Sequence, residues 1–140
     1  MPVRIDGHSF RDKEEGDRYL ELKRMVTDGE ISKFTVVERS CKLVKGYHKC
    51  ETCGAISDTT GCDTCGSKTY FSTGIQYHPS FIVYENDGKV VLEDVMRSLN
   101  MSHVWNLKKI LYDLTYTAPL YVIVRGKRYR KTSMGWVVVV

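Results

Sequence analysis

Long apolar runs are missing from this 140-residue sequence. A membrane-spanning helix needs about 18 or more consecutive apolar residues, and we therefore expect no membrane span. The opening residues, MPVRIDGHSF, also lack the apolar core of a secretory signal peptide. We accordingly expect a cytoplasmic protein. Its apolar content of 42% is enough for one ordinary hydrophobic core.

Acidic residues are missing from the C-terminal stretch VRGKRYRKTSMGWVVVV, although the whole chain has a formal net charge of only +4. A basic cluster with Tyr129 inside it suits the phosphate backbone of a nucleic acid. A charged hairpin edge that discourages pairing with other sheets is equally compatible with the pattern. The candidate nucleic-acid-binding residues of this stretch are Arg125, Lys127, Arg128, Arg130 and Lys131.

Local patterns predict two helices. Asp12 and Glu15 form a capping box in DKEE, and Gly29 is a natural C-cap, so the first helix is expected over about 12–28. A second amphipathic helix is expected in SHVWNLKKILYDLTY, with Ser102 as its cap. Its apolar stripe is predicted to contain Val104, Leu107, Leu111 and Leu114.

Three further stretches are expected to be extended. EISKFTVVERSCKLV is rich in β-branched and aromatic residues. GIQYHPSFIVYENDGKVVLEDVM reads as two strands joined by a turn at NDG. The final WVVVV is expected to form a last strand that pairs with LYVIVR.

The remaining signal is a pair of CxxC motifs with the spacing C-x2-C-x8-C-x2-C. In a reducing cytosol such pairs more often bind metal than form disulfides. Four cysteines complete a tetrahedral zinc site and leave no open position for catalysis, so we expect a structural zinc. The predicted ligands are Cys50, Cys53, Cys62 and Cys65.

Basic residues surround these cysteines. Lys45, Lys49 and Lys68 lie close to them in the sequence and are candidate nucleic-acid contacts. Zinc modules of this size also bind proteins or brace a fold, and the ligands alone leave these alternatives open. Cys41 stands apart and is expected to be a small buried apolar residue.

Three segments together resemble a known family: IDGHSFRDKEEGDRYLELKRMVTDGEISKF, IQYHPSFIVYENDGKVVLEDV and WNLKKILY. They are similar to phage-borne small endonucleases with the PD-(D/E)XK fold, which is related in architecture to resolvases of branched DNA. The resemblance implies an α+β fold, with a small mixed β-sheet flanked by two helices. It also implies a single nuclease-like domain over 1–140, in which 45–72 is an inserted zinc-binding module, and host cytoplasm as the location if a phage encodes the chain.

The family's active site has four positions, and each can be carried over onto a residue of this sequence. The helix glutamate falls on Glu15, and the first strand acid falls on Ser80. The second strand acid falls on Asp94, preceded by Glu93, and the lysine falls on Met96. In the family the carboxylates hold Mg²⁺ and the lysine orients the attacking water.

Two of these positions depart from the family pattern. Serine is a weak ligand for Mg²⁺, and the methionine at 96 offers neither a proton nor a positive charge. A nuclease of ordinary power is therefore not expected, unless Lys108 or Lys109 supplies the missing charge from the second helix. Met96 is then explained by packing alone.

The surviving acids have structural alternatives. Glu15 is explained by the capping box. Because Glu93 and Asp94 alternate on a strand, one is expected to face solvent and the other to face inward, where it needs a partner or a raised pKa.

These observations predict a nucleic-acid-associated binding protein, with DNA favoured, that regulates phage transcription or DNA metabolism and carries zinc but no catalytic activity. One alternative is an active Mg²⁺-dependent, structure-selective endodeoxyribonuclease with a relocated lysine. Another is an adaptor that binds host or phage RNA polymerase. Related resolvases are often dimers, so a homodimer is one of the oligomeric states left open.

Overall fold

The first helix, α1, begins and ends where the capping residues lie. In the computed structural model, which describes residues 1–139, α1 spans Lys13–Thr27. Asp12 accepts a 3.0 Å hydrogen bond from the backbone N–H of Glu15, and Gly29 follows the helix with a φ of 75°. The carboxylate of Glu15 accepts from the backbone N–H of Arg11 at 3.0 Å, one residue earlier than a standard capping box predicts. The predicted helix is confirmed.

The second helix, α2, spans His103–Thr115 and is capped by Ser102, as predicted. Its predicted buried stripe is wrong, because Val104 is 62% exposed and Leu114 is 80% exposed. The buried side chains of α2 are Trp105 and Tyr112. Both rings pack on the sheet, and each also donates a hydrogen bond, Trp105 to Asp94 and Tyr112 to the carbonyl oxygen of Ala118. Aliphatic side chains cannot make such bonds.

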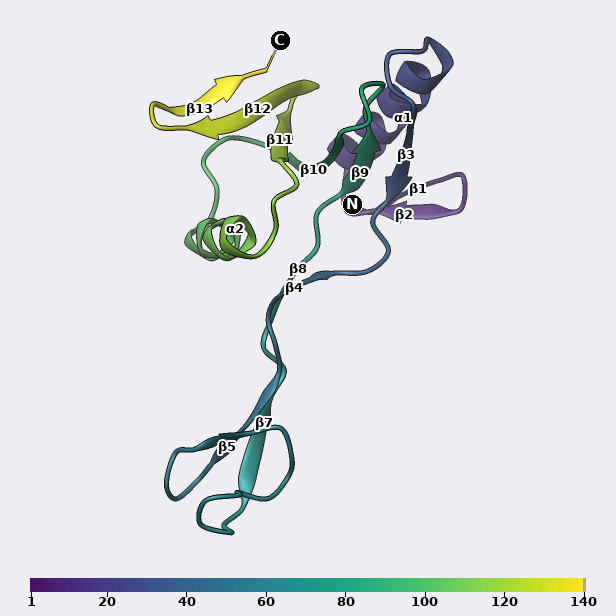
Figure 1. Ribbon diagram of the computed structural model, residues 1–140. Coiled ribbons are helices and arrows are strands. Elements are labelled where there is room, and N and C mark those ends of the chain that lie inside the picture. The colour runs from purple at the N-terminus through teal and green to yellow at the C-terminus, as the bar shows by residue number, and fades with distance from the viewer. Residues whose placement is uncertain (140) are drawn as a thin grey trace.

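A six-stranded mixed sheet lies between the two helices (Figure 1). Its strand order is β13-β12-β11-β10-β9-β3, and only the β10–β11 pair among these is parallel. The strands of this sheet are β3 (Lys33–Val36), β9 (Phe81–Tyr84), β10 (Val90–Met96), β11 (Leu120–Val124), β12 (Lys127–Thr132) and β13 (Gly135–Val138). The predicted turn at NDG connects β9 to β10. The expected α+β class, with two helices flanking a mixed sheet, is therefore confirmed.

Both faces of this sheet are covered, so the core has two halves. On one face, Val91 and Val95 of β10 pack with Tyr19 and Leu22 of α1. On the other face, Leu92 of β10 belongs to a cluster that contains the two aromatic rings of α2. A short hairpin of β1 (Val3–Ile5) and β2 (His8–Phe10) packs against α1. Neither helix within residues 1–139 is long and apolar enough to cross a membrane.

The C-terminal strand pairs with a different neighbour from the one predicted. β13 pairs with β12, and β12 pairs with β11, so the expected pairing of WVVVV with LYVIVR is wrong. The two-residue turn at Arg125 and Gly126 folds β12 directly onto β11 and takes the edge that β13 was expected to occupy. Val140, the last residue of the predicted strand, lies outside the described residues.

Two strands leave this core as an arm that carries the cysteine module. β4 (Cys41–Val44) pairs with β8 (Ile75–Tyr77), and the module at the far end of the arm is the three-stranded sheet β6-β5-β7 (Figure 1). The module strands are β5 (Tyr47–Cys50), β6 (Ile56–Ser57) and β7 (Thr69–Ser72). Gly74 lies where module meets arm, with a φ of 80°, and a Cβ there would lie 2.1 Å from the carbonyl oxygen of Val44. Only glycine fits this junction.

Candidate metal centre and acid cluster

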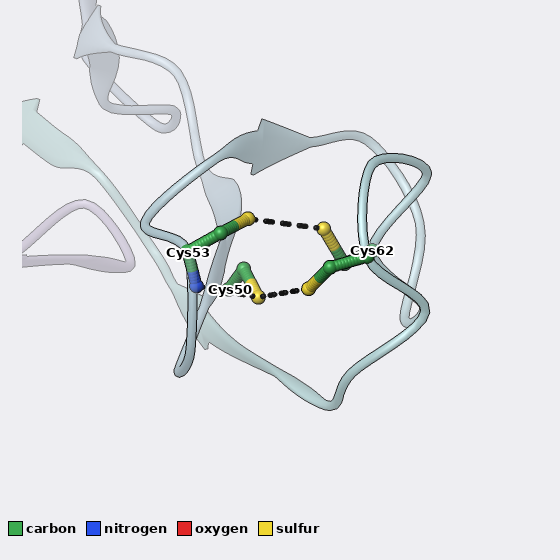
Figure 2. A group of neighbouring side chains, drawn as sticks. Cys50, Cys53 and Cys62 are labelled. Atoms are coloured by element: carbon green, nitrogen blue, oxygen red, sulfur yellow. Dashed lines mark hydrogen bonds between the residues drawn. The ribbon is translucent and has the colours of Figure 1, made fainter.

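Four cysteine sulfurs meet in the module. The Sγ atoms of Cys50 and Cys65 lie 3.5 Å apart, those of Cys53 and Cys62 lie 3.6 Å apart, and all four lie within 4.8 Å of one another. In Figure 2 the labelled side chains point from two loops toward a common centre. A tetrahedral ion with Zn–S bonds of about 2.3 Å separates its sulfurs by about 3.8 Å. The cluster is therefore consistent with a structural metal such as zinc.

The two loops are shaped to present these sulfurs. Gly54 and Gly66, one directly after each CxxC pair, adopt φ values of 75° and 73°, which favour glycine. The backbone N–H groups of Thr52 and Cys53 approach the Sγ of Cys50, each at 3.4 Å. Amide donors around a sulfur favour its thiolate form, which is the form that binds metal.

Hydrogen bonds in the second loop lower the pKa values of its two thiols. Hydrogen bonds from the side chain and backbone of Ser67 lower the pKa of Cys65 to about 6. Backbone hydrogen bonds from Cys65 and Thr64 lower the pKa of Cys62. A lowered pKa favours the thiolate form of these two cysteines, which supplies the negative charge that a divalent cation needs. Cys41 lies on β4 instead, half-buried against the α2 side of the core, and burial raises its pKa.

The residues that the resemblance aligned with a nuclease active site include a second cluster, which lies beside α1. Ser80 donates through Oγ to Glu15 Oε2 at 2.7 Å, and the same Oγ lies 3.5 Å from Asp94 Oδ1. The backbone N–H of Val95 donates to Ser80 Oγ at 3.1 Å. The serine therefore bridges the two carboxylates, and three of the four aligned positions come together.

A cation that the resemblance did not suggest completes this cluster. The Arg11 guanidinium Nη2 lies 3.6 Å from Glu15 Oε2 and 3.6 Å from Asp94 Oδ1, and it donates to the carbonyl oxygen of Val95. Its positive charge thus lies between the two carboxylates. The i,i+4 spacing of Arg11 and Glu15 is visible in the sequence, but the contact of Arg11 with Asp94 joins two residues that are far apart in the sequence.

Asp94 points to the α2 side of the sheet, where its carboxylate accepts two hydrogen bonds from aromatic side chains. Its Oδ2 accepts from Tyr77 Oη and, at 3.0 Å, from Trp105 Nε1. Burial raises the pKa of Asp94, and the hydrogen bonds from Tyr77 and Trp105 counter part of that rise. No sequence pattern joins these two aromatic residues to the site, because Tyr77 and Trp105 lie 17 and 11 residues from Asp94 and in different elements.

Glu93 points to the opposite side of the sheet and is also buried. Arg18 of α1 binds its two carboxylate oxygens at 2.8 and 2.6 Å, and Arg128 of β12 approaches Oε2 at 2.7 Å. Glu93 and Asp94 are 0% and 1% exposed, so the expectation that one of them faces solvent is wrong. It assumed an open face, but α1 and α2 cover both faces of β10.

The fourth position that the resemblance aligned lies apart from the charged cluster. Met96 is half-buried and packs with the α2 half of the core, as its thioether predicts. Among the described contacts, no hydrogen bond or ion pair joins Lys108 to Glu15, Ser80 or Asp94. Its neighbour Lys109 binds Asp113 at 2.6 Å. The charge that reaches the acids therefore comes from Arg11 rather than from α2.

The predicted nucleic-acid contacts fall on two separate surfaces. Lys45, Lys49 and Lys68 belong to the module, where Lys49 lies opposite the exposed Tyr70 on neighbouring strands. Most of the others are exposed on or beside β12: Arg125, Lys127, Arg130 and Lys131. Arg128 differs, because it is half-buried and also binds Glu85 at 2.7 Å. Although burial lowers the pKa of Arg128, its attraction to Glu93 and Glu85 raises it overall.

Comparison with known proteins defines the family but not the activity. A family model with the description "Protein of unknown function (DUF1064)" matches residues 2–131, and the chain therefore belongs to the DUF1064 family. No curated protein and no solved structure gives a significant match. What the site does must therefore be inferred from its own geometry.

Proposed function

We propose that this chain is a nucleic-acid-binding protein built on a PD-(D/E)XK nuclease-like core that has lost catalysis. In this proposal the four-cysteine module holds a structural zinc and, with the exposed basic residues on or beside β12, supplies the binding surface. Its role is in phage transcription or DNA metabolism, as the resemblance of the sequence implies.

The position of Arg11 carries the proposal. A divalent ion shared by Glu15 and Asp94 would have to enter the space beside the guanidinium, which already offsets part of the charge of the two carboxylates. Mg²⁺ prefers several oxygen ligands with negative charge, and the third aligned position offers only the neutral hydroxyl of Ser80. The acids are therefore satisfied internally, without a metal.

The missing lysine supports the same conclusion. Met96 packs in the core, and its thioether can neither hold a phosphate nor orient a water. Loss of a metal carboxylate and of a lysine each removes transition-state stabilisation, and every 1.36 kcal/mol is about tenfold in rate. We therefore expect binding without cleavage.

The nucleic acid is favoured over other partners by the chemistry of the exposed residues. On one face of the module, Ile56, Lys49 and Tyr70 form a row across the three strands. An exposed ring beside a lysine suits an unpaired base and its phosphate. The second basic surface is formed by the exposed residues on or beside β12. Zinc is assigned a structural role because four thiolates leave no open position.

A combined binding and cleavage assay tests this function. The full chain, loaded with zinc, is mixed with labelled duplex, branched and single-stranded DNA and with RNA, in Mg²⁺ or Mn²⁺. We expect retention of nucleic acid with no cleavage. Cleavage that needs the divalent ion and is abolished by Asp94→Asn, but not by the exposed control Asp113→Asn, would establish an active nuclease instead. Absence of all binding, together with capture of RNA polymerase from extract, would favour an adaptor.

A further inference from the structure

Three neighbouring strands place a cation at the same edge of the sheet. β10 and β11 are parallel, and Met96 pairs with Val124 at their carboxyl ends. The next residues along the chain are Arg97 and Arg125. Lys127 begins β12 and pairs with Val124. The register alone therefore brings three positive charges together.

A pocket of about 330 Å³ lies between these cations. Arg97, Arg125 and Lys127 line it together with the apolar side chains of Leu99 and Val124 and the ring of Tyr129, and no acidic residue is among its lining residues. The volume is at the lower end of the range for small-molecule sites, about 300–1,000 Å³. Positive charges above an apolar floor suit a phosphate attached to a sugar or base.

The cations of this pocket are available to a ligand. Within residues 1–139, neither Arg125 nor Lys127 makes a side-chain hydrogen bond or lies within 4.0 Å of a carboxylate oxygen. Arg97 is 71% exposed and has only long contacts, at 3.7 Å to Asp12 and 3.9 Å to Glu14. Arg125 also lines a second pocket, and that pocket contains acidic residues of α1. The pocket between the three cations is separate from it and has no acidic lining residue.

The backbone at Arg125 is unusual for this residue type. Arg125 and Gly126 have φ values of 51° and 77° and form the two central positions of the turn between β11 and β12. Such turns favour glycine, which has no Cβ, or asparagine and aspartate, whose short polar side chains hydrogen-bond locally, whereas other side chains are strained at positive φ. Strain of this kind is found mostly where a residue is needed for function. Here the residue in the strained position is an arginine that lines the pocket.

We propose that this pocket binds a phosphate group, and that the phosphate belongs to a nucleic acid strand. The inference rests on the nucleic-acid binding proposed above and assigns it a position, beside the carboxyl ends of β10 and β11. Arg97 is the member of the site that sequence reasoning did not single out. The same chemistry would accept a free mononucleotide, so the test includes both sources.

Arg125→Asn separates a binding role from a structural role. Asparagine relieves the strained turn, so we expect the melting temperature to rise while affinity for a labelled oligonucleotide falls at least about tenfold. The slope of log affinity against log salt should fall by about 1, as for loss of one phosphate contact. Lys127→Gln should weaken binding similarly. Lys89→Gln, an exposed lysine in the turn between β9 and β10, is the matched control and should change neither quantity.

The possible outcomes distinguish this inference from the proposed function. If the zinc-loaded protein binds the oligonucleotide and Arg125→Asn leaves affinity and salt slope unchanged, the pocket inference is wrong and the proposed function stands. If it binds a 5′-mononucleotide but no oligonucleotide, and Arg125→Asn weakens that binding, the phosphate site is confirmed and its nucleic-acid source is wrong. If neither probe binds, both proposals are wrong.

Discussion

Replacing Glu93 by glutamine removes the carboxylate that two arginines share inside the core. Glu93 is 0% exposed, and the side chains of Arg18 and Arg128 are 7% and 17% exposed. Loss of one partner from a buried ion pair costs about 3–5 kcal/mol, because the remaining charge stays desolvated and unpaired. We expect a loss in this range for Glu93→Gln, tempered by the second carboxylate, Glu85, that Arg128 keeps.

Urea unfolding of the zinc-loaded protein measures this loss. For a small protein the slope is about 1–3 kcal/mol per molar urea, so the midpoint should fall by roughly 1–5 M. Glu21→Gln removes an exposed carboxylate from a pair with Arg24 on the surface of α1, and we expect no measurable shift. If the midpoint of Glu93→Gln stays within error of the wild type, the buried ion pairs of Glu93 do not stabilise the fold.

A double-mutant cycle extends this prediction. If Arg18 serves to compensate Glu93, then Arg18→Met should destabilise the wild type strongly and the Glu93→Gln variant much less. Equal effects of Arg18→Met in the two backgrounds would show that the two side chains act independently. The physical reason for coupling is the bidentate contact between Arg18 and Glu93, in which two guanidinium nitrogens donate to the two carboxylate oxygens at 2.8 and 2.6 Å.

Three further predictions concern the metal, the buried aspartate and the arm. Cys53→Ser should abolish retention of one zinc per chain against a chelator, whereas Cys41→Ser, which lies outside the cluster, should leave it unchanged. Because burial raises the pKa of Asp94 above 3.8, the folded state holds this proton more tightly than the unfolded state. Its contribution to stability should thus fall as pH rises above about 4, and the fall should disappear in Asp94→Asn. Gly74→Ala should destabilise the chain by about 1 kcal/mol or more in thermal unfolding, while Gly61→Ala, with open space around it, should not.

Sequence patterns predicted the local features of this molecule well. The cysteine spacing identified the thiol cluster, because both pairs lie in loops whose glycines shape them locally. Capping residues located both helices, since the Asp12 and Ser102 contacts reach only three residues along the chain.

The misassigned features depend on contacts between distant segments. The buried face of α2 could not be read from its apolar stripe, because Trp105 is placed by a hydrogen bond to Asp94 across the core. The partners of Glu93 lie 75 and 35 residues away, so its burial was not visible in the alternation of β10. Arg11 was missed for the same reason, since no local pattern places a residue before the first helix against the end of a central strand.

Titration of Mn²⁺ into the zinc-loaded protein, followed by calorimetry, tests most directly the claim that Arg11 closes the acid cluster. The account predicts no Mn²⁺ bound at Glu15 and Asp94, so the wild type and Asp94→Asn should give the same titration. Binding of one Mn²⁺ by the wild type that is lost in both Asp94→Asn and Glu15→Gln would contradict the account and indicate a working metal site.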